Sequence, residues 1–333
     1  MQTSMCTIDC SPFHDALCEL KRRLPTHPRQ DLAGFFSVAA QLSVEIPAPL
    51  LKRVSDFRQR GNDDGFLHLK GLPIDEDALP PTPSSYPTPV DRPLLDTEAW
   101  IALIGMVVGK ATGYKENRFG SVFQDVYPAL GAHRLTAHNY DTELRFHTEM
   151  AYHVQQPDYL VIACARADHE HVAQTRITSV RKIAPMLGER DLHTLRTTPL
   201  QWHVDLAFRS DADPDPTTRL FLLTDGDDNL RYDGSLILPH ETEEAAEALQ
   251  AFSTAADQVA ATVYLQPGDL VLIDNIRTSH ARTPFTPRFD GTDRWLTRIF
   301  VRGSSHSIPA RHADVVPFQL RAPDQRIRSA ALA

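Results

Sequence analysis

The spacing of apolar residues changes character along the chain. Between residues 12 and 63 they recur at three- and four-residue intervals, as in Leu50, Leu51, Val54 and Phe57, which predicts mainly helical structure. Beyond residue 64, short apolar runs alternate with turn residues, and residues 80–89 are too rich in proline for any regular element. We expect strands at 65–71, 119–126, 159–165, 173–180, 219–224, 260–265, 269–274 and 295–301, and helices at 96–109 and 241–255.

Many short strands with helices inserted between them indicate an α+β, mainly β fold. We expect a double-stranded β-helix, a cupin-like jelly roll, as the core, with flanking and inserted helices. The chain would form one domain over residues 1–333. Residues 1–63 would pack on the core as a mainly helical region, residues 64–303 would form the jelly roll with its insertions, and residues 304–333 would form a C-terminal tail.

Composition restricts the possible partners. The formal net charge of −9 over 333 residues, without a persistent basic cluster, argues against a nucleic-acid partner. No stretch approaches the ~20 apolar residues of a membrane span, and the N-terminus lacks a signal-peptide pattern. We therefore expect a cytoplasmic protein with no membrane partner. The four cysteines form no C-x-x-C pair, so we expect inert thiols.

The triplet His147, Thr148 and Glu149 is the most informative local feature. In an extended segment successive side chains alternate faces, so the imidazole and the carboxylate would point the same way. A third ligand could come from His280, which follows the apolar run 269–274. Two imidazoles and one carboxylate on one face of a metal leave the opposite face open, which suits non-haem Fe(II) and oxygen chemistry.

Other histidine clusters compete with this triplet, because short motifs often match by chance. His203 and Asp205 have the same spacing, but they precede an acidic, proline-broken segment, residues 210–216, that is more typical of a mobile lid. His312 and Asp314 have no histidine after them, and the cluster 169–171 lies in a polar stretch. The triplet at 147–149 remains the preferred metal site.

Two arginines follow His280. Arg294 would begin the strand 295–301 and Arg298 would lie near its middle, four residues later, so both guanidiniums would project to one face. Such planar, forked donors are suited to holding carboxylates.

These residues carry a family resemblance. The segment 146–153, FHTEMAYH, together with the segment 274–298, resembles the clavaminate synthase-like branch of the Fe(II)/2-oxoglutarate-dependent dioxygenases, close to the arginine, asparagine and lysine hydroxylases. The resemblance spans residues 46–318. It implies that His147, Glu149 and His280 hold Fe(II), and that Arg294, assisted by Thr175, binds 2-oxoglutarate. Arg298 would take the α-carboxylate of an amino-acid substrate.

By this resemblance the enzyme consumes 2-oxoglutarate and O2, releases succinate and CO2, and hydroxylates an unactivated C–H bond. A carboxylate at Glu149 leaves no vacancy for a halide, which favours hydroxylation over halogenation. The product could instead be that of a desaturase. A different class also stays open: a metal-binding jelly roll that is an isomerase or a zinc hydrolase.

Three acids are candidates for binding the rest of the substrate: Glu116, Asp205 and Asp233. Several acids near one pocket favour a cationic amino acid, because an unpaired buried carboxylate costs several kcal/mol. We therefore expect a small-molecule substrate, a free basic amino acid such as arginine or lysine. The carbon that is oxidised, a carrier-bound substrate and a homodimer all stay open.

Overall fold

The computed structural model describes residues 6–85, 92–131, 138–211, 213–224, 226, 228–238, 242–303 and 313–324. Its largest sheet, the major sheet, has eight strands. Seven of them follow the order β1 (Thr7–Asp9), β2 (Phe66–Lys70), β13 (Leu270–Asp274), β6 (Tyr159–Arg166), β15 (Trp295–Arg302), β3 (Lys110–Tyr114) and β16 (Ala313–Val316). The eighth, β4 (Gln124–Val126), pairs with β15 beside β3.

A second sheet, the minor sheet, completes the jelly roll. It has the order β12 (Ala261–Val263), β7 (Thr175–Ser179), β14 (Thr278–Arg282) and β5 (Leu144–His147). Two hairpins, β8 (Leu200–His203) with β9 (Thr217–Leu220) and β10 (Leu223–Thr224) with β11 (Asn229–Leu230), lie outside both sheets. The strand-rich core with flanking and inserted helices confirms the expected fold class.

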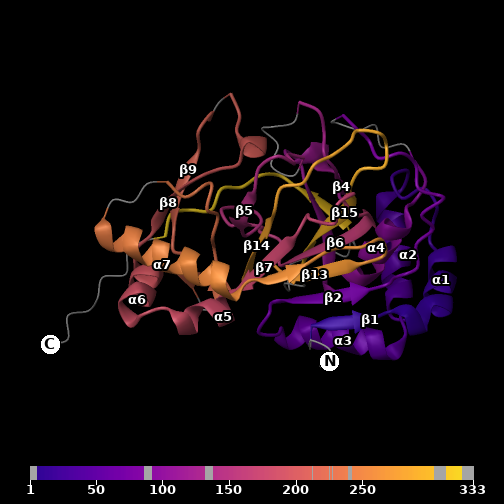
Figure 1. Cartoon of the computed structure of the whole chain (residues 1–333), viewed down its shortest axis with the longest axis horizontal. Coiled ribbons are helices and arrows are strands. Elements are labelled where there is room, and N and C mark those ends of the chain that lie inside the picture. The colour runs from indigo at the N-terminus through magenta and orange to yellow at the C-terminus, as the bar shows by residue number, and fades with distance from the viewer. Residues whose placement is uncertain are drawn as a thin grey trace.

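The helices form two groups at opposite ends of the molecule (Figure 1). One group comprises α1 (His14–Arg22), α2 (Leu32–Ser43), α3 (Ala48–Arg60) and α4 (Asp96–Val108). The other comprises α5 (Val180–Ile183), α6 (Glu189–Thr197) and α7 (Glu243–Val259). The predicted helices at 96–109 and 241–255 correspond to α4 and α7.

Strand β6 shows why its sequence is apolar without alternation. Leu160 and Ile162 belong to the hydrophobic core shared with the minor sheet and α7. Val161 and Ala163 belong to the other core, between the major sheet and helices α1 to α4. A strand buried on both faces reads as a continuous apolar run.

Some expected elements differ from those in the structure. Of the strand expected at 119–126, only Gln124–Val126 is a strand, because Arg118 and Phe119 have φ of 50° and 56° in a tight turn. The run 219–224 is divided between β9 and β10. The segment Ala313–Val316 pairs in parallel with β3, so this part of the expected tail is a strand of the core sheet. The domain division itself stays a prediction.

Among the described helices, none is long and apolar enough by itself to cross a membrane. Helices α2 and α3 pass the length and composition test only as a pair bent by 109°. Both bury apolar side chains, such as Phe36 and Leu50, inside the protein. The apolar character of this pair is therefore explained by packing against the major sheet.

Burial also explains the cysteines. Cys10 and Cys164 are fully buried, and burial raises the pKa of each thiol to about 12. A thiol with so high a pKa stays protonated and unreactive at neutral pH. This agrees with the expectation of inert thiols for these two residues.

Glu98 joins the helical layer to the chain around it. Its side chain is 1% exposed and forms ion pairs with Arg29 and Arg92, the latter at 2.8 Å. One carboxylate oxygen also accepts a hydrogen bond from the backbone N–H of Leu95 at the start of α4. Burial alone would raise the pKa of Glu98, but the charges of Arg92 and Arg29 lower it below the usual 4.5.

Replacing Glu98 with Gln should therefore destabilise the protein by about 3 kcal/mol at pH 7, because a largely buried Arg29 loses its anionic partner and Arg92 keeps only Asp125. A carboxyl group whose folded-state pKa is lowered stabilises the fold above its unfolded pKa of about 4.5, and this contribution is lost as the pH falls through the folded value. Urea unfolding at pH 7 and at lower pH should show the difference between wild type and E98Q shrinking in acid. Glu45→Gln, which removes an exposed pair with Arg23, is the matched control and should change little. An E98Q deficit that stays constant with pH would contradict this account.

Candidate metal centre and substrate site

The pairing of β5 with β14 brings the two predicted histidine ligands together. His147 and His280 are direct partners across these antiparallel strands, and their ring centroids are 4.2 Å apart. The Nε2 atom of each ring lies 3.9 Å from Oε1 of Glu149. Ligand atoms of all three residues therefore lie within 4.8 Å of one another, as expected from the sequence.

Glu149 reaches this cluster for a reason that differs from the prediction. β5 ends at His147, and Glu149 lies in the following turn, where Met150 has a φ of 52°. Thr148 does point away, as expected, and its hydroxyl donates to the carbonyl of Thr278 at 2.9 Å. The carboxylate is thus placed by a tight turn and not by strand alternation.

The protonation of the cluster suits a divalent metal. Burial and the neighbouring His147 lower the pKa of His280 to about 3, so its ring is neutral. Nδ1 of His147 lies 2.9 Å from the carbonyl of Arg145, which directs its Nε2 toward Glu149. Burial would raise the pKa of Glu149, but the charge of Arg298 and the two histidines lower it well below its usual range. Two imidazole nitrogens and an ionised carboxylate fit an Fe(II) ion with open positions.

Arg294 is a buried cation whose guanidinium is uncommitted. It is 4% exposed and, among the described residues, has no hydrogen-bond or ion-pair partner; its guanidinium lies 5.6 Å from the ring centroid of Phe285. Burial lowers the pKa of Arg294. Burial and the charge of Arg294 also lower the pKa of Arg282, on β14, to about 10. Two guanidiniums against one aromatic ring form a site that fits a carboxylate.

Thr175 lies on the same face of the minor sheet as His280. It is the first residue of β7, is 5% exposed, and pairs with Arg282 of β14, two residues from His280. Residues two apart on a strand share a face.

Arg298 is already engaged with the metal cluster. Its Nη1 donates to Oε1 of Glu149 at 2.6 Å, and its Nε donates to Oε1 of Gln124 at 3.1 Å. β15 begins at Trp295, so Arg294 lies just before the strand, and the bulge at this end of the pairing lies on β6, where Trp295 pairs with Arg166 and Leu296 with Cys164. The sequence analysis missed Gln124, and the pairing of β4 with Arg298 of β15 is the signal that reveals it.

Two of the three predicted acids lie in the region of the cluster. Asp233 forms an isolated β-bridge with His147, and burial raises the pKa of its carboxyl. Asp205 caps the short turn Leu206–Phe208 by accepting from the N–H of Ala207. Burial, and the charges of Asp205, Asp233 and Glu149, together raise the pKa of Tyr152 well above 10, so this hydroxyl senses all three acids.

Glu116 is placed differently. It is exposed, lies beyond the end of β3, and its carboxylate accepts a hydrogen bond from the backbone of Phe318 at 2.8 Å. Among the described residues it has no contact with the metal cluster. The structure therefore gives Glu116 a role in holding the C-terminal segment.

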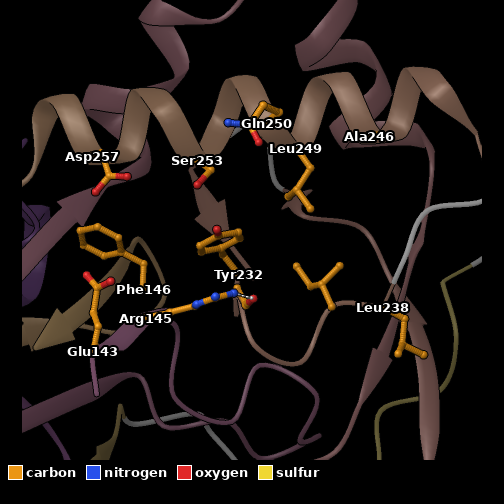
Figure 2. A pocket seen from close by; sticks show the side chains of 12 residues that line it. Glu143, Arg145, Phe146, Tyr232, Leu238, Ala246, Leu249, Gln250, Ser253 and Asp257 are labelled. Carbon is orange, nitrogen blue, oxygen red and sulfur yellow. Dashed lines mark hydrogen bonds between the residues drawn. The ribbon is translucent and has the colours of Figure 1, made fainter. Parts of the chain in front are cut away.

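The segment around Asp233 also borders a separate cavity of about 620 Å³. Tyr232 and Gly234 line it, together with Phe146 of β5 and residues of α7 such as Ser253 (Figure 2). None of the three clustered ligand residues lines this cavity. Asp233 therefore lies between two residues that line this cavity, and it pairs with His147 of the cluster.

The competing histidines are accounted for in other ways. Nδ1 of His203 lies 2.9 Å from a carboxylate oxygen of Asp215, in the acidic segment expected to be a lid. His169 lies 3.2 Å from Asp293, and with Asp290 these residues form the second described group of possible ligands. Both oxygens of Asp293 accept backbone N–H groups of the loop before Arg294, which gives this group a structural explanation. His312 lies outside the described residues.

Comparison with known proteins agrees with this geometry. The sequence model of the taurine catabolism dioxygenase TauD/TfdA family matches residues 28–300. Clavaminate synthase 2 of Streptomyces clavuligerus is 45% identical over 298 residues, which cover 89% of this chain and 91% of that protein. L-lysine 3-hydroxylase of Catenulispora acidiphila is 32% identical over 80% of this chain and 75% of that protein.

Among solved structures, asparagine oxygenase in complex with Fe(II), 2S,3S-3-hydroxyasparagine and succinate superposes with a TM-score of 0.82. The identity is 31%, and the match covers 93% of this chain and 99% of that one. Enzymes of the matched family use Fe(II), 2-oxoglutarate and O2. This chain therefore belongs to the TauD/TfdA family and is a 2-oxoglutarate-dependent non-haem iron dioxygenase.

Proposed function

We propose that this dioxygenase hydroxylates an unactivated C–H bond of a free basic L-amino acid, similar to arginine or lysine, with release of succinate and CO2. The observation that carries the proposal is the pair of carboxylates Asp205 and Asp233 in the region of the metal cluster. Each has one oxygen committed to local backbone groups, and the other oxygen has no hydrogen-bond partner among the described residues.

The metal ligands in this proposal are His147, Glu149 and His280. When bound, Fe(II) supplies the activation of O2 at the open positions. The protein residues hold one nitrogen of each imidazole and one carboxylate oxygen near one another, each nitrogen 3.9 Å from Oε1 of Glu149. The ion pair with Arg298 keeps Glu149 ionised and therefore able to bind a cation.

Arg294 is the proposed partner of the distal carboxylate of 2-oxoglutarate, with Thr175 beside it. A buried guanidinium without a protein partner leaves its hydrogen-bonding capacity for a ligand. The neighbouring charge of Arg282 adds attraction for an anion. Both guanidiniums lie near the ring of Phe285, at 5.3 Å for Arg282 and 5.6 Å for Arg294.

The amino-acid substrate would lie on the other side of the cluster. Arg298 retains Nη2, which has no partner among the described residues, for an α-carboxylate. Asp233 and Asp205 would receive a cationic side chain. Because burial raises the pKa of Asp233, a matched cation would favour its charged form and recover part of the desolvation cost. The relative named L-lysine 3-hydroxylase supports a basic substrate.

A second candidate is a reaction of the clavaminate synthase kind. One observation favours it: identity with clavaminate synthase 2 is 45%, compared with 32% for the lysine hydroxylase. Desaturation would use the same residues and differs only in the product. Membership of the family overturns the alternatives expected from the sequence, an isomerase, a zinc hydrolase or a binding protein without oxygenase activity.

Replacing Arg294 with Ala should raise the KM for 2-oxoglutarate roughly 100-fold, because a buried, charge-assisted contact costs about 3 kcal/mol when one partner is truncated. Succinate formation at varied 2-oxoglutarate concentration measures this. Arg190→Ala, which removes an exposed pair with Glu247, is the control and should behave as wild type. Normal 2-oxoglutarate affinity in R294A would remove Arg294 from the site.

The substrate proposal is tested by incubating the enzyme with Fe(II), 2-oxoglutarate and free arginine, lysine, asparagine or citrulline, and by measuring product masses. We expect arginine or lysine to gain one oxygen atom. Loss of two hydrogens would identify a desaturase. Preference for the neutral asparagine or citrulline, or for an acidic or apolar amino acid added to the same panel, would contradict the proposal.

Asp233→Asn should raise the KM for the basic amino acid roughly 10- to 100-fold, because hydrogen bonds to charged groups are worth about 1.5–3 kcal/mol. The KM for 2-oxoglutarate should change little. Asp205→Asn gives the same measurement for the second acid, and Glu116→Gln is the control that should leave both constants unchanged. An equal effect of D233N on a neutral amino acid would show that Asp233 does not select for charge.

A further inference from the structure

The turn between β13 and β14 carries a buried amide that holds the backbone of Glu149. Asn275 is 0% exposed. Its Oδ1 accepts the N–H of Glu149 at 2.9 Å, and its Nδ2 donates to the carbonyls of Glu149 at 3.0 Å and Pro157 at 2.8 Å. Both donors and one acceptor site of this side chain are therefore used. Two of the three hydrogen bonds hold Glu149 itself, one at its N–H and one at its carbonyl.

The same turn reaches the other ligands. The carbonyl of Thr278 accepts the hydroxyl of Thr148, and the hydroxyl of Thr278 donates to the carbonyl of Asp274 at 2.7 Å. His280 follows two residues later on β14. The five residues 274–278 thus contact Thr148 and Glu149. They are followed on β14 by His280, the third predicted ligand.

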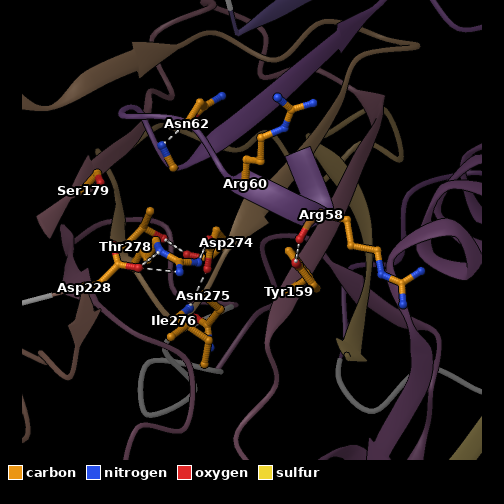
Figure 3. A network of polar contacts seen from close by, with 12 residues as sticks. Arg58, Arg60, Asn62, Tyr159, Ser179, Asp228, Asp274, Asn275, Ile276 and Thr278 are labelled. Carbon is orange, nitrogen blue, oxygen red and sulfur yellow. Dashed lines mark hydrogen bonds and ion pairs between the residues drawn. The ribbon is translucent and has the colours of Figure 1, made fainter. Parts of the chain in front are cut away.

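The turn is itself tied down from outside (Figure 3). Arg277 pairs with Asp274 at 2.8 Å and with Asp228 at 2.5 Å, and Arg181 pairs with the same Asp228 at 2.8 Å. The backbone N–H of Asn275 donates to the carbonyl of Asp158 at 2.9 Å. Asn275 therefore projects from a support whose position is fixed independently of the metal cluster.

Glu149 needs such a support because of where it lies. It is outside β5, so no strand ladder holds its peptide groups, and the next residue has a positive φ. Its Oε1 also accepts a hydrogen bond from Arg298 at 2.6 Å, so this guanidinium competes with a metal for the same oxygen. With its backbone free, Glu149 could stay with the guanidinium instead.

We propose that Asn275 is a positioning residue that fixes Glu149 for metal binding through the Glu149 backbone. This inference rests on the proposed role of Glu149 as an iron ligand. Only a planar amide of this length offers an acceptor to one N–H and donors to two carbonyls. An Asp in its place would direct a carboxylate oxygen at two carbonyl oxygens, and an Ala would leave one buried N–H without its partner.

The test compares wild type with Asn275→Ala, Asn275→Asp, Asn275→Ser and the stability control Asp228→Ala. D228A removes the outer ion pairs of the turn without touching Glu149. Fe(II) affinity is measured without oxygen by titration, and thermal unfolding is followed with and without Fe(II). We expect N275A and N275D to bind Fe(II) about 10- to 100-fold more weakly, as removal of groups that orient metal ligands typically does. D228A should lower the unfolding temperature but keep the wild-type affinity.

Each outcome decides a different question. Wild-type Fe(II) affinity in N275A, or a loss of affinity no greater than in D228A at equal stability, would overturn the positioning role. If N275A and N275D do not fold, N275S decides: a smaller Fe(II)-induced rise in unfolding temperature supports the role, and an unchanged rise overturns it. Glu149→Ala is run in parallel. If wild type itself does not bind Fe(II), or E149A binds it equally well, the proposed function fails before Asn275 is judged.

Discussion

The antiparallel register of β5 and β14 is the constraint on which the site depends. It sets His147 directly opposite His280, although the two residues are 133 positions apart along the chain. A shift of either strand by one residue would turn one imidazole to the opposite face of the sheet. Arg282 on β14 and Thr175 on β7 lie on the His280 face of the same sheet, so the register orients the proposed 2-oxoglutarate residues together with the metal ligands.

The charges around the cluster are arranged asymmetrically. On the Phe285 side there are two guanidiniums, and Arg294 has no anionic partner among the described residues. On the Tyr152 side there are two carboxylates that raise the pKa of its hydroxyl. Burying unpaired charges of opposite sign at separate places is costly without ligands. The arrangement would become favourable with a dianion on one side and a cation on the other, which is the basis for proposing 2-oxoglutarate and a basic amino acid as its ligands.

Sequence reasoning located the site well where it depended on residue chemistry and less well where it depended on backbone detail. His147, Glu149 and His280 could be grouped because few residue sets suit iron, and the structure brings their ligand atoms within 4.8 Å of one another. The turn that places the carboxylate of Glu149 beside the histidines could not be predicted, because the pattern of apolar residues does not reveal a positive φ at Met150. β14 was missed for a similar reason: Thr278–Arg282 is buried but mostly polar. The expected common face of Arg294 and Arg298 stays a prediction, because Arg294 lies just before the first residue of β15.

The contact between Arg298 and Glu149 links these observations. A guanidinium beside a carboxylate disfavours the binding of a divalent cation there, since the guanidinium and the cation repel each other. Here the guanidinium donates to the oxygen that also faces both histidines. We infer that binding of a metal and of an anionic substrate group is coupled: with Oε1 of Glu149 committed to a metal, the donor of Arg298 would be available to a substrate carboxylate. Gln124, which holds Nε of Arg298, keeps the guanidinium beside the cluster while its partner changes.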